Sequence, residues 1–192
     1  MNYNDITNRI TAHLSLIEKI QSNSSIQKDI LQAIKLISKQ LKIGQSIHFC
    51  GNGGSAADAA HLAAELSGRY LLNRPALPAE ALHTNGAAIT AISNDFGYKE
   101  VFSRLLEAKA KPNDILYLMT TSGQSENIKS VLNSAVKMNL SVIALTGRTR
   151  STIYKKANIH IKIPSDQTPR IQEAMMLIGH IICGGVETKL YG

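Results

Sequence analysis

The sequence predicts an α/β protein: a three-layer sandwich in which helices cover both faces of a five-stranded parallel sheet. Five short apolar segments alternate along the chain with segments whose apolar residues recur every three or four positions. The short segments are predominantly apolar, and the two central ones, 115–119 and 142–146, lack the polar alternation of a half-exposed sheet. Strands of this kind are buried on both faces, as in parallel sheets covered by helices on both sides.

Two leading helices are predicted within residues 1–42. Apolar residues recur at helical spacing from Ile6 to Ile20 and, after a break at 22–25, from Ile30 to Leu41. These apolar stripes are larger than one small sheet face needs, so we expect the helices to pack against each other or against another subunit. We expect residues 43–192 to form the α/β core of the same single domain.

Strands and helices then alternate along the rest of the chain. The expected strands are residues 46–50, 79–82, 115–119, 142–146 and 159–163. The expected helices end near Arg69 and Met138, cover 85–93 and 98–109, and run from Thr168 or Pro169 to about Leu190, with a short helical segment after Gly147. We expect residues 94–97 to separate the two middle helices.

The composition indicates a soluble, cytoplasmic protein. Of the 192 residues, 44% are hydrophobic and 18% are charged, and no secretory signal is apparent. The longest uncharged apolar stretch, residues 174–186, is shorter than the roughly 18 to 20 residues of a membrane span, so we expect no membrane segment. Cys50 and Cys183 lie in apolar contexts that suit reduced core thiols.

The net charge of +7 suits a phosphorylated small molecule as ligand. A nucleic-acid partner would call for an aromatic-studded basic run, zinc-knuckle spacing or a helix-turn-helix signal, and the sequence has none of them. The basic residues of the second half are more simply a solvated face: Arg148, Arg150, Lys155, Lys156 and Lys162. We therefore expect no nucleic acid.

Two polar loops directly follow predicted strands, so both lie at the carboxyl edge of the sheet, where parallel sheets bind ligands. The first, residues 51–55, has glycines that allow close backbone approach and leads into a helix whose N-terminus favours an anion. The second, residues 120–125, places four hydroxyls at a helix N-terminus and suits a phosphate monoester. A capping box of Thr121 and Gln124 is the alternative, and it would account for one or two of these hydroxyls.

The first loop also matches the Gly-x-Gly-x-x-Ala pattern of dinucleotide-binding proteins, between a strand and a helix. Such a site needs an acidic residue at the end of the second strand to hold the ribose. Residues 82–85 of this chain are Leu-His-Thr-Asn, and Glu80 comes too early. The sequence therefore argues against NAD.

Polar side chains interrupt two otherwise apolar helices. His61 and Glu65 are four residues apart, and Gln172 and His180 are eight apart, so each pair shares one helix face. Each pair alone is compatible with a satisfied structural contact. Together they could transfer protons on a carbonyl substrate or hold a metal ion, and the pattern leaves open whether the two helices meet.

Five separated motifs carry a resemblance to a known family. They are Gly51-Asn52-Gly53-Gly54-Ser55, His61-x-x-x-Glu65-Leu66-x-Gly68-Arg69-Tyr70, Asn94-Asp95-Phe96-Gly97, Thr121-Ser122-Gly123-x-Ser125, and Arg170-Ile171-Gln172-Glu173 with His180. In this order they resemble the sedoheptulose 7-phosphate (phosphoheptose) isomerases of the sugar isomerase (SIS) domain family. The resemblance implies a homotetramer with active sites at subunit interfaces. It also implies conversion of D-sedoheptulose 7-phosphate to D-glycero-D-manno-heptose 7-phosphate, the first step toward nucleotide-activated heptose for lipopolysaccharide, capsule or surface-layer glycans.

The resemblance also implies roles for individual residues. Glu65 would be the base that moves a proton between C1 and C2 through an enediol, and His180 the acid that serves the oxygen. In several relatives His61, Glu65, Gln172 and His180 bind zinc, so one Zn²⁺ per subunit is implied. The residues implied to bind the sugar phosphate are Asn52, Gly53, Gly54, Ser55, Glu65, Asn94, Asp95, Thr120, Thr121, Ser122, Ser125 and Gln172.

A non-catalytic SIS tetramer is the alternative. Proteins of the DiaA type bind a phosphosugar or the replication initiator, and they share the Ser-Ala-Ala turn found here at residues 55–57. They lack the glutamate and the histidine at the positions that match Glu65 and His180. The presence of both residues therefore favours catalysis.

Overall fold

The computed structural model describes residues 1–148 and 152–192, so Arg150 of the basic segment lies outside the described residues. The strands are β1 (Ile47–Gly51), β2 (Ala79–Ala81), β3 (Ile115–Thr120), β4 (Ser141–Thr146) and β5 (Ile159–Lys162). They form one sheet in the order β2-β1-β3-β4-β5, and every neighbouring pair is parallel. The predicted five-stranded parallel sheet is confirmed.

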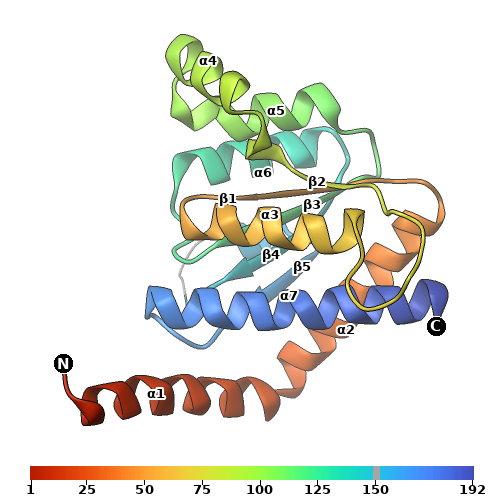
Figure 1. Cartoon of the computed structure of the whole chain (residues 1–192). Coiled ribbons are helices and arrows are strands. Elements are labelled where there is room, and N and C mark those ends of the chain that lie inside the picture. The colour runs from red at the N-terminus through yellow and green to blue at the C-terminus, as the bar shows by residue number, and fades with distance from the viewer. Residues whose placement is uncertain (149–151) are drawn as a thin grey trace.

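Helices flank this sheet on both sides, as predicted (Figure 1). They are α1 (Tyr3–Gln21), α2 (Ser24–Lys42), α3 (Gly54–Ser67), α4 (Gly86–Phe96), α5 (Val101–Lys109), α6 (Glu126–Lys137) and α7 (Thr168–Tyr191), with short 3₁₀ turns at Leu82–Thr84, Tyr98–Glu100 and Thr152–Lys155. Within the described residues, no helix is long and apolar enough to cross a membrane.

Each face of the sheet has its own core. On β3, Ile115, Tyr117 and Met119 pack toward α2, α3 and α7, whereas Leu116 and Leu118 pack toward α5 and α6. Side chains of successive strand residues point to opposite faces, so a strand buried on both faces is expected to be apolar at most positions. The two thiols, Cys50 and Cys183, are buried and free.

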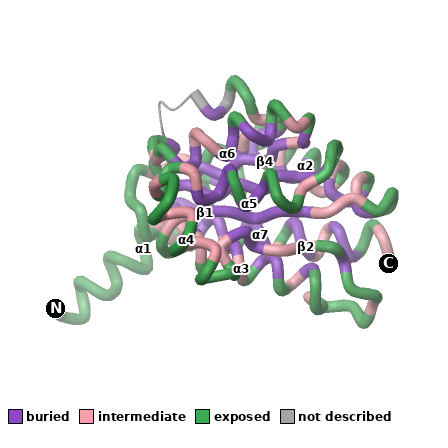
Figure 2. Tube along the Cα trace, turned by 90° about the horizontal axis from the view of Figure 1, so that it is seen from above, coloured by how far each residue is buried: buried purple, intermediate pink, exposed green. Residues whose placement is uncertain are grey.

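The two leading helices differ in how much of their apolar surface is buried. α2 packs along α7 and buries apolar residues over most of its length. α1 projects away from the body of the molecule, and most of it is exposed (Figures 1 and 2). It buries only Leu16 and Ile20, near its end. Its apolar stripe therefore lies largely in solvent in the single chain.

The end of α4 differs from the prediction. We expected residues 94–97 to separate two helices, but α4 continues to Phe96 and ends at Gly97, whose φ of 83° is left-handed. Asn94 and Asp95 therefore lie in the last helical turn. Asn85 at the N-cap and Gly97 at the C-cap provide the two boundary signals, and neither requires a break at Asn94.

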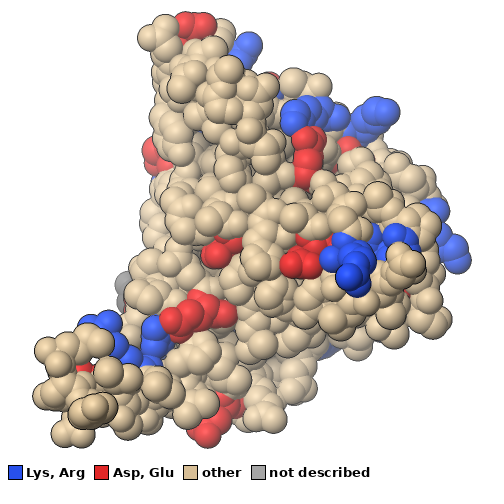
Figure 3. Space-filling model, viewed as in Figure 1, with Lys and Arg blue, Asp and Glu red and all other residues tan. Residues whose placement is uncertain are grey.

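Charged residues on the face seen in Figure 3 are divided into several groups. Lys and Arg side chains gather over separate parts of this face, and acidic side chains lie between them. The net positive charge thus does not form a continuous basic stripe on this face. Such an arrangement gives a general attraction for anions rather than a track for a nucleic-acid backbone.

A buried ion pair ties the segment after α3 to α7. Arg74 Nε donates to Glu187 Oε1 at 2.9 Å, and both side chains are only 1% exposed. The Glu187 carboxylate also accepts hydrogen bonds from the backbone N–H groups of Tyr70, Leu71 and Leu72. Burial raises the pKa of Glu187, but the three N–H donors and Arg74 outweigh it and lower the pKa to about 2.

Replacing Glu187 should therefore destabilise the fold in a pH-dependent way. We expect Glu187→Gln to lower the free energy of unfolding at pH 7 by about 3–5 kcal/mol, because the buried charge of Arg74 loses its counter-charge. A folded-state pKa below the unfolded value stabilises above about pH 4.5. Roughly 3 kcal/mol of this stability is lost as the pH falls toward 2.

Urea unfolding at a series of pH values measures this loss. The difference between wild type and Glu187→Gln should shrink as the pH is lowered from 5 to 2. The matched control is Glu126→Gln, which removes the exposed pair of Glu126 with Lys129 and should change stability by less than about 0.5 kcal/mol. A pH-independent difference between wild type and Glu187→Gln would contradict the assignment.

Candidate active site

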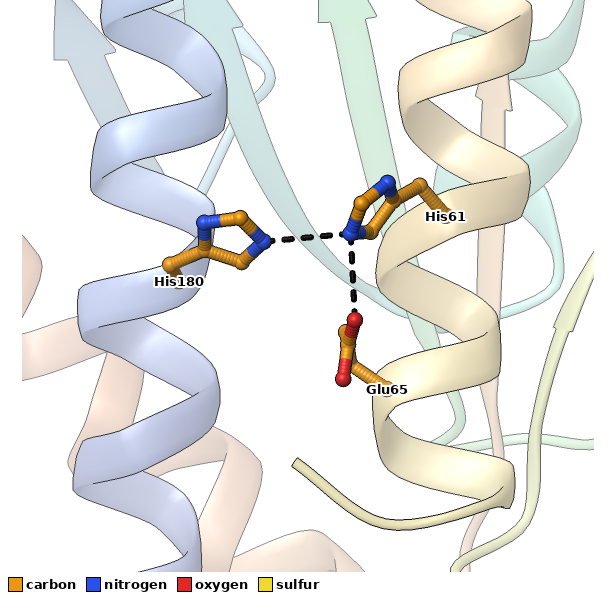
Figure 4. Close-up of side chains that lie close together, drawn as sticks. All are labelled: His61, Glu65 and His180. Atoms are coloured by element: carbon orange, nitrogen blue, oxygen red, sulfur yellow. Dashed lines mark hydrogen bonds and ion pairs between the residues drawn. The ribbon is translucent and has the colours of Figure 1, made fainter. Parts of the chain in front are cut away.

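His61, Glu65 and His180 meet between α3 and α7 (Figure 4). His61 Nε2 lies 3.0 Å from Glu65 Oε1 and 3.2 Å from His180 Nε2. The three ligand atoms lie within 4.8 Å of one another. The Glu65 side chain is 23% exposed and that of His61 50% exposed, so the cluster is open to solvent. The structure thus answers the question that the sequence left open, because the two helices do meet here.

A glycine allows this close approach. A Cβ atom added to Gly179 would lie 2.5 Å from Cδ1 of Leu62, closer than two carbon atoms can pack. Gly179 immediately precedes His180 on α7, and Leu62 immediately follows His61 on α3. The packing of Leu62 against the bare backbone of α7 therefore brings the two imidazoles together.

Gln172 lies nearer to the glycine loop than to the imidazoles. Eight residues separate it from His180, which corresponds to about 12 Å along α7. A Cβ atom on Gly54, the first residue of α3, would overlap the Gln172 amide. Among the described residues, no hydrogen bond joins Gln172 to His61, Glu65 or His180. The structure thus groups three of the four residues expected to bind zinc and places the fourth beside Gly54.

Lack of space at one position and backbone conformation at another favour glycine in the first loop. A Cβ atom on Gly51 would lie 2.6 Å from the carbonyl oxygen of Ser55, and Gly53 has a left-handed φ of 56°. Ser55 is buried in the first turn of α3. These constraints explain the glycines of the first loop without any dinucleotide.

Hydroxyl groups of the second loop accept hydrogen bonds from the backbone of the same loop. Thr120 Oγ1 accepts from the backbone N–H of Gly123 at 3.1 Å, and Ser122 Oγ accepts from that of Gln124 at 3.2 Å. α6 begins at Glu126 with Ser125 as its N-cap, so the alternative capping box of Thr121 and Gln124 is wrong.

A cavity of about 290 Å³ opens beside this loop and is large enough for a phosphate group. It is bordered by the β4 end, the β5–α7 connection and α7. Its lining residues are Thr121, Ser122, Arg148, Ser165, Asp166, Thr168 and Ile171.

Asn52 links the two loops. Its side-chain amide exchanges two hydrogen bonds, of 2.9 and 2.8 Å, with that of Asn127 in the first turn of α6. The Tyr98 hydroxyl donates to Asn52 Oδ1 at 3.2 Å. The sequence analysis missed Asn127 and Tyr98. Only their proximity in the sequence to the motifs that end at Ser125 and Gly97 could have indicated them. This network fixes the first loop relative to the second.

Asn94 and Asp95 lie apart from the histidine cluster within one chain. Asn94 Nδ2 donates to Asp95 Oδ1 at 2.9 Å, and both residues are exposed. α4 lies on the side of the sheet opposite to α7 (Figure 1). Among the described residues, no hydrogen bond, ion pair or ring contact joins either side chain to His61, Glu65 or His180.

The residues of the cluster fit a zinc ion. Two imidazole nitrogens and a carboxylate oxygen are donors that Zn²⁺ prefers, and catalytic zinc sites keep a position open for water or substrate. Asp58 lies one turn before His61 and has a buried Oδ2 atom without a hydrogen-bond partner among the described residues. Burial raises the pKa of Asp58, and the neighbouring His61 partly lowers it again.

Comparison with known proteins identifies first a domain class and then, within that class, a narrower family of similar sequences. A family model described as SIS domain matches residues 10–147. The phosphoheptose isomerase of Akkermansia muciniphila is 45% identical over 179 residues, 93% of this chain and 95% of the relative. That of Rhodospirillum rubrum is 44% identical over 161 residues, 84% of this chain and 86% of the relative.

A solved structure gives the same result. The phosphoheptose isomerase from Francisella tularensis superposes with a TM-score of 0.91 at 34% identity, covering 98% of this chain and 100% of that one. The chain belongs to the SIS domain family, and within it to the phosphoheptose isomerases.

The contact between α3 and α7 can be tested by filling it. Gly179→Ala should lower the free energy of unfolding by about 1–3 kcal/mol, because its Cβ overlaps Leu62. Combining Gly179→Ala with Leu62→Ala should cost less than the sum of the two single changes. Urea unfolding of the three variants and wild type provides this comparison.

Gly86→Ala is the control for the added methyl group, since a Cβ on Gly86 meets nothing within 4 Å and the residue lies in a helix. It should leave stability unchanged or slightly raised. Purely additive effects of Gly179→Ala and Leu62→Ala would show that the two residues are not in close contact.

Proposed function

We propose that this chain converts D-sedoheptulose 7-phosphate to D-glycero-D-manno-heptose 7-phosphate. The observation that carries the proposal is the cluster of Glu65, His61 and His180 at the junction of α3 and α7, in a chain whose relatives are named phosphoheptose isomerases. An aldose–ketose isomerase needs a base over a carbon acid, an acid directed at oxygen, and a rigid phosphate anchor. We infer that this protein uses Glu65, His180 and the second loop for these tasks.

The reaction moves one proton between neighbouring carbons. Glu65 takes the proton from C1 of the ketose while His180 donates a proton to the C2 carbonyl oxygen, which gives the enediol. Glu65 then delivers the proton that it took from C1 to C2, and His180 takes the proton from O1, which gives the aldose and restores both groups. The position of His61 supports these roles, because its Nε2 atom is directed at both Glu65 and His180.

The phosphate is proposed to bind at the second loop, beside the cavity lined by Thr121, Ser122 and Thr168. Thr120 and Ser125 complete the hydroxyl set. The sugar is proposed to contact the first loop through Asn52, Gly53, Gly54 and Ser55, with Gln172 at its edge. The packing of Gln172 against Gly54 supports this placement.

We propose that His61, Glu65, Gln172 and His180 hold one Zn²⁺ per subunit. When bound, zinc would act as a Lewis acid that polarises oxygens of the substrate. Metal binding would then compete with proton transfer at Glu65 and His180, since an atom bound to the ion cannot also accept a proton. His61, to which no proton-transfer role is given, has no such conflict.

We further propose a cytoplasmic homotetramer with active sites at subunit interfaces, in which residues 1–42 serve packing. The exposed apolar residues of α1, among them Tyr3, Ile6, Ile10 and Leu14, support an interface there. The separation of Asn94 and Asp95 from the cluster supports a site completed by a second subunit. The product would supply lipopolysaccharide, capsule or surface-layer heptose.

Substitution of the two catalytic residues tests the reaction. Wild type should convert sedoheptulose 7-phosphate to an aldose phosphate, and Glu65→Gln and His180→Gln should fold but lose about 10²- to 10⁴-fold in kcat. Lys137→Gln, an exposed change at the end of α6, should keep wild-type kcat. An inactive wild type with zinc supplied, or fully active variants, would refute the proposal.

Metal analysis tests the zinc separately. Protein purified without chelator should contain about one zinc per subunit, and His61→Gln should contain much less because a nitrogen ligand is lost. Added zinc should raise the melting temperature of the chelated wild type more than that of His61→Gln. Full activity after exhaustive chelation would exclude an essential metal.

A further inference from the structure

We propose that Tyr70 is a positioning residue for His180 and that the buried pair of Arg74 and Glu187 holds Tyr70 in place. The catalytic consequence rests on the proposed function, whereas the geometric argument stands on contacts within this chain. Neither Tyr70 nor the ion pair belongs to the residues proposed to touch substrate or metal. Their position against the cluster suggests what they do.

The Tyr70 ring stacks, with an offset, against the imidazole of His180. The ring centroids are 5.4 Å apart, and the planes are inclined by only 17°. A stacked ring restricts rotation of the imidazole about its Cβ–Cγ bond but leaves the nitrogens, which lie in the ring plane, free to bind other groups. The Nε2 atom of His180 accordingly stays directed at His61, 3.2 Å away.

The sequence of α7 leaves space for this ring. Gly184 follows His180 by four residues, so it lies one turn further along the same face. A Cβ atom on Gly184 would lie 3.3 Å from Cε1 and 3.7 Å from Cδ1 of Tyr70. Even one methyl group would press on the ring. Glycine at this position thus fits the stacking of Tyr70 on His180.

Glu187 fixes the backbone from which the ring extends. It lies one turn beyond Gly184 and accepts from Tyr70 N at 2.9 Å, from Leu71 N at 2.8 Å and from Leu72 N at 2.9 Å. Three bonds to consecutive N–H groups define both the position and the direction of this segment. The orientation of Tyr70 is therefore set by α7, the helix that carries His180.

Arg74 connects the same carboxylate to the other helix of the site. Its Nη2 donates to the backbone oxygen of Glu65 at 2.8 Å, and its Nη1 donates to that of Leu66 at 2.7 Å. The guanidinium thus satisfies carbonyl groups in the last turn of α3 while it pairs with Glu187. One buried ion pair links the helix of the base, the helix of the acid and the ring between them.

This arrangement should act on turnover and metal binding rather than on substrate binding. An imidazole that must be ordered at each turnover loses the advantage of a preset geometry, and outer contacts of metal ligands typically change affinity by about 10- to 100-fold. The ring face supplies the contact, since the phenol oxygen forms no hydrogen bond with any described residue. A phenylalanine at this position should therefore keep the positioning effect of the tyrosine.

Three variants test the proposal: Tyr70→Ala, Tyr70→Phe and Gly184→Ala. Tyr70→Ala should lose about tenfold or more in kcat with KM changed less than about threefold, and should bind Zn²⁺ about 10- to 100-fold more weakly in competition with a chromophoric chelator. Tyr70→Phe should stay within about twofold of wild type in all three quantities. Gly184→Ala should fall between them.

Leu71→Ala is the matched control, because this neighbour in the same segment has a side chain that is 68% exposed. It should keep wild-type kcat and zinc affinity, and the melting temperature of every variant verifies folding. The absorption spectrum of the Co²⁺-substituted protein should change in Tyr70→Ala and not in Tyr70→Phe, since it reports the ligand geometry directly.

Two outcomes would overturn the proposal. One is a Tyr70→Ala variant that keeps wild-type values of both kcat and zinc affinity. The other is a Tyr70→Phe variant as impaired as Tyr70→Ala, which would assign the role to the hydroxyl instead of the stacked ring. A wild type without isomerase activity would refute the proposed function, and zinc affinity would then decide the role of Tyr70 alone.

Discussion

The packing of α3 against α7 is the contact on which the candidate site depends. His61 and Glu65 share a helix, and their proximity needs nothing beyond the spacing of the helix. His180 joins them only because Gly179 leaves room for Leu62. The parallel sheet beneath sets the direction of both helices, and its two-sided core keeps them in place. A contact between apolar and bare-backbone atoms thus determines the geometry of a polar site.

Much of this molecule could be predicted from the sequence, because its elements obey strong local rules. The strands are largely apolar and the helices carry regular apolar stripes, so their number, order and class were predicted correctly. The end of α4 was not, since a helix continues through Asn94 and Asp95 when the nearest strong stop signal is Gly97. The capping box at Thr121 failed for a related reason, because α6 begins five residues later.

The candidate site itself was predictable only in parts. The pair of His61 and Glu65 follows from periodicity. The residue pattern offered a joint site with Gln172 and His180 as one option, and only the family resemblance implied that the two helices meet. Contacts between residues more than one hundred positions apart leave no local trace, as the meeting of His61 with His180 illustrates. Tyr70 was part of a recognised motif without any role, because stacking depends on the spatial relation between a loop and a distant helix.

The anchoring of residues 70–74 limits how a substrate can reach the site. Many enzymes close a mobile loop over bound substrate and open it to release product. Lifting this segment would break a buried ion pair and three backbone hydrogen bonds to a carboxylate. Each hydrogen bond to a charged group contributes about 1.5–3 kcal/mol, so open molecules would be a small minority at a given time. The segment is therefore a fixed wall of the site. Entry and release of a sugar phosphate are therefore not expected to depend on displacement of this segment.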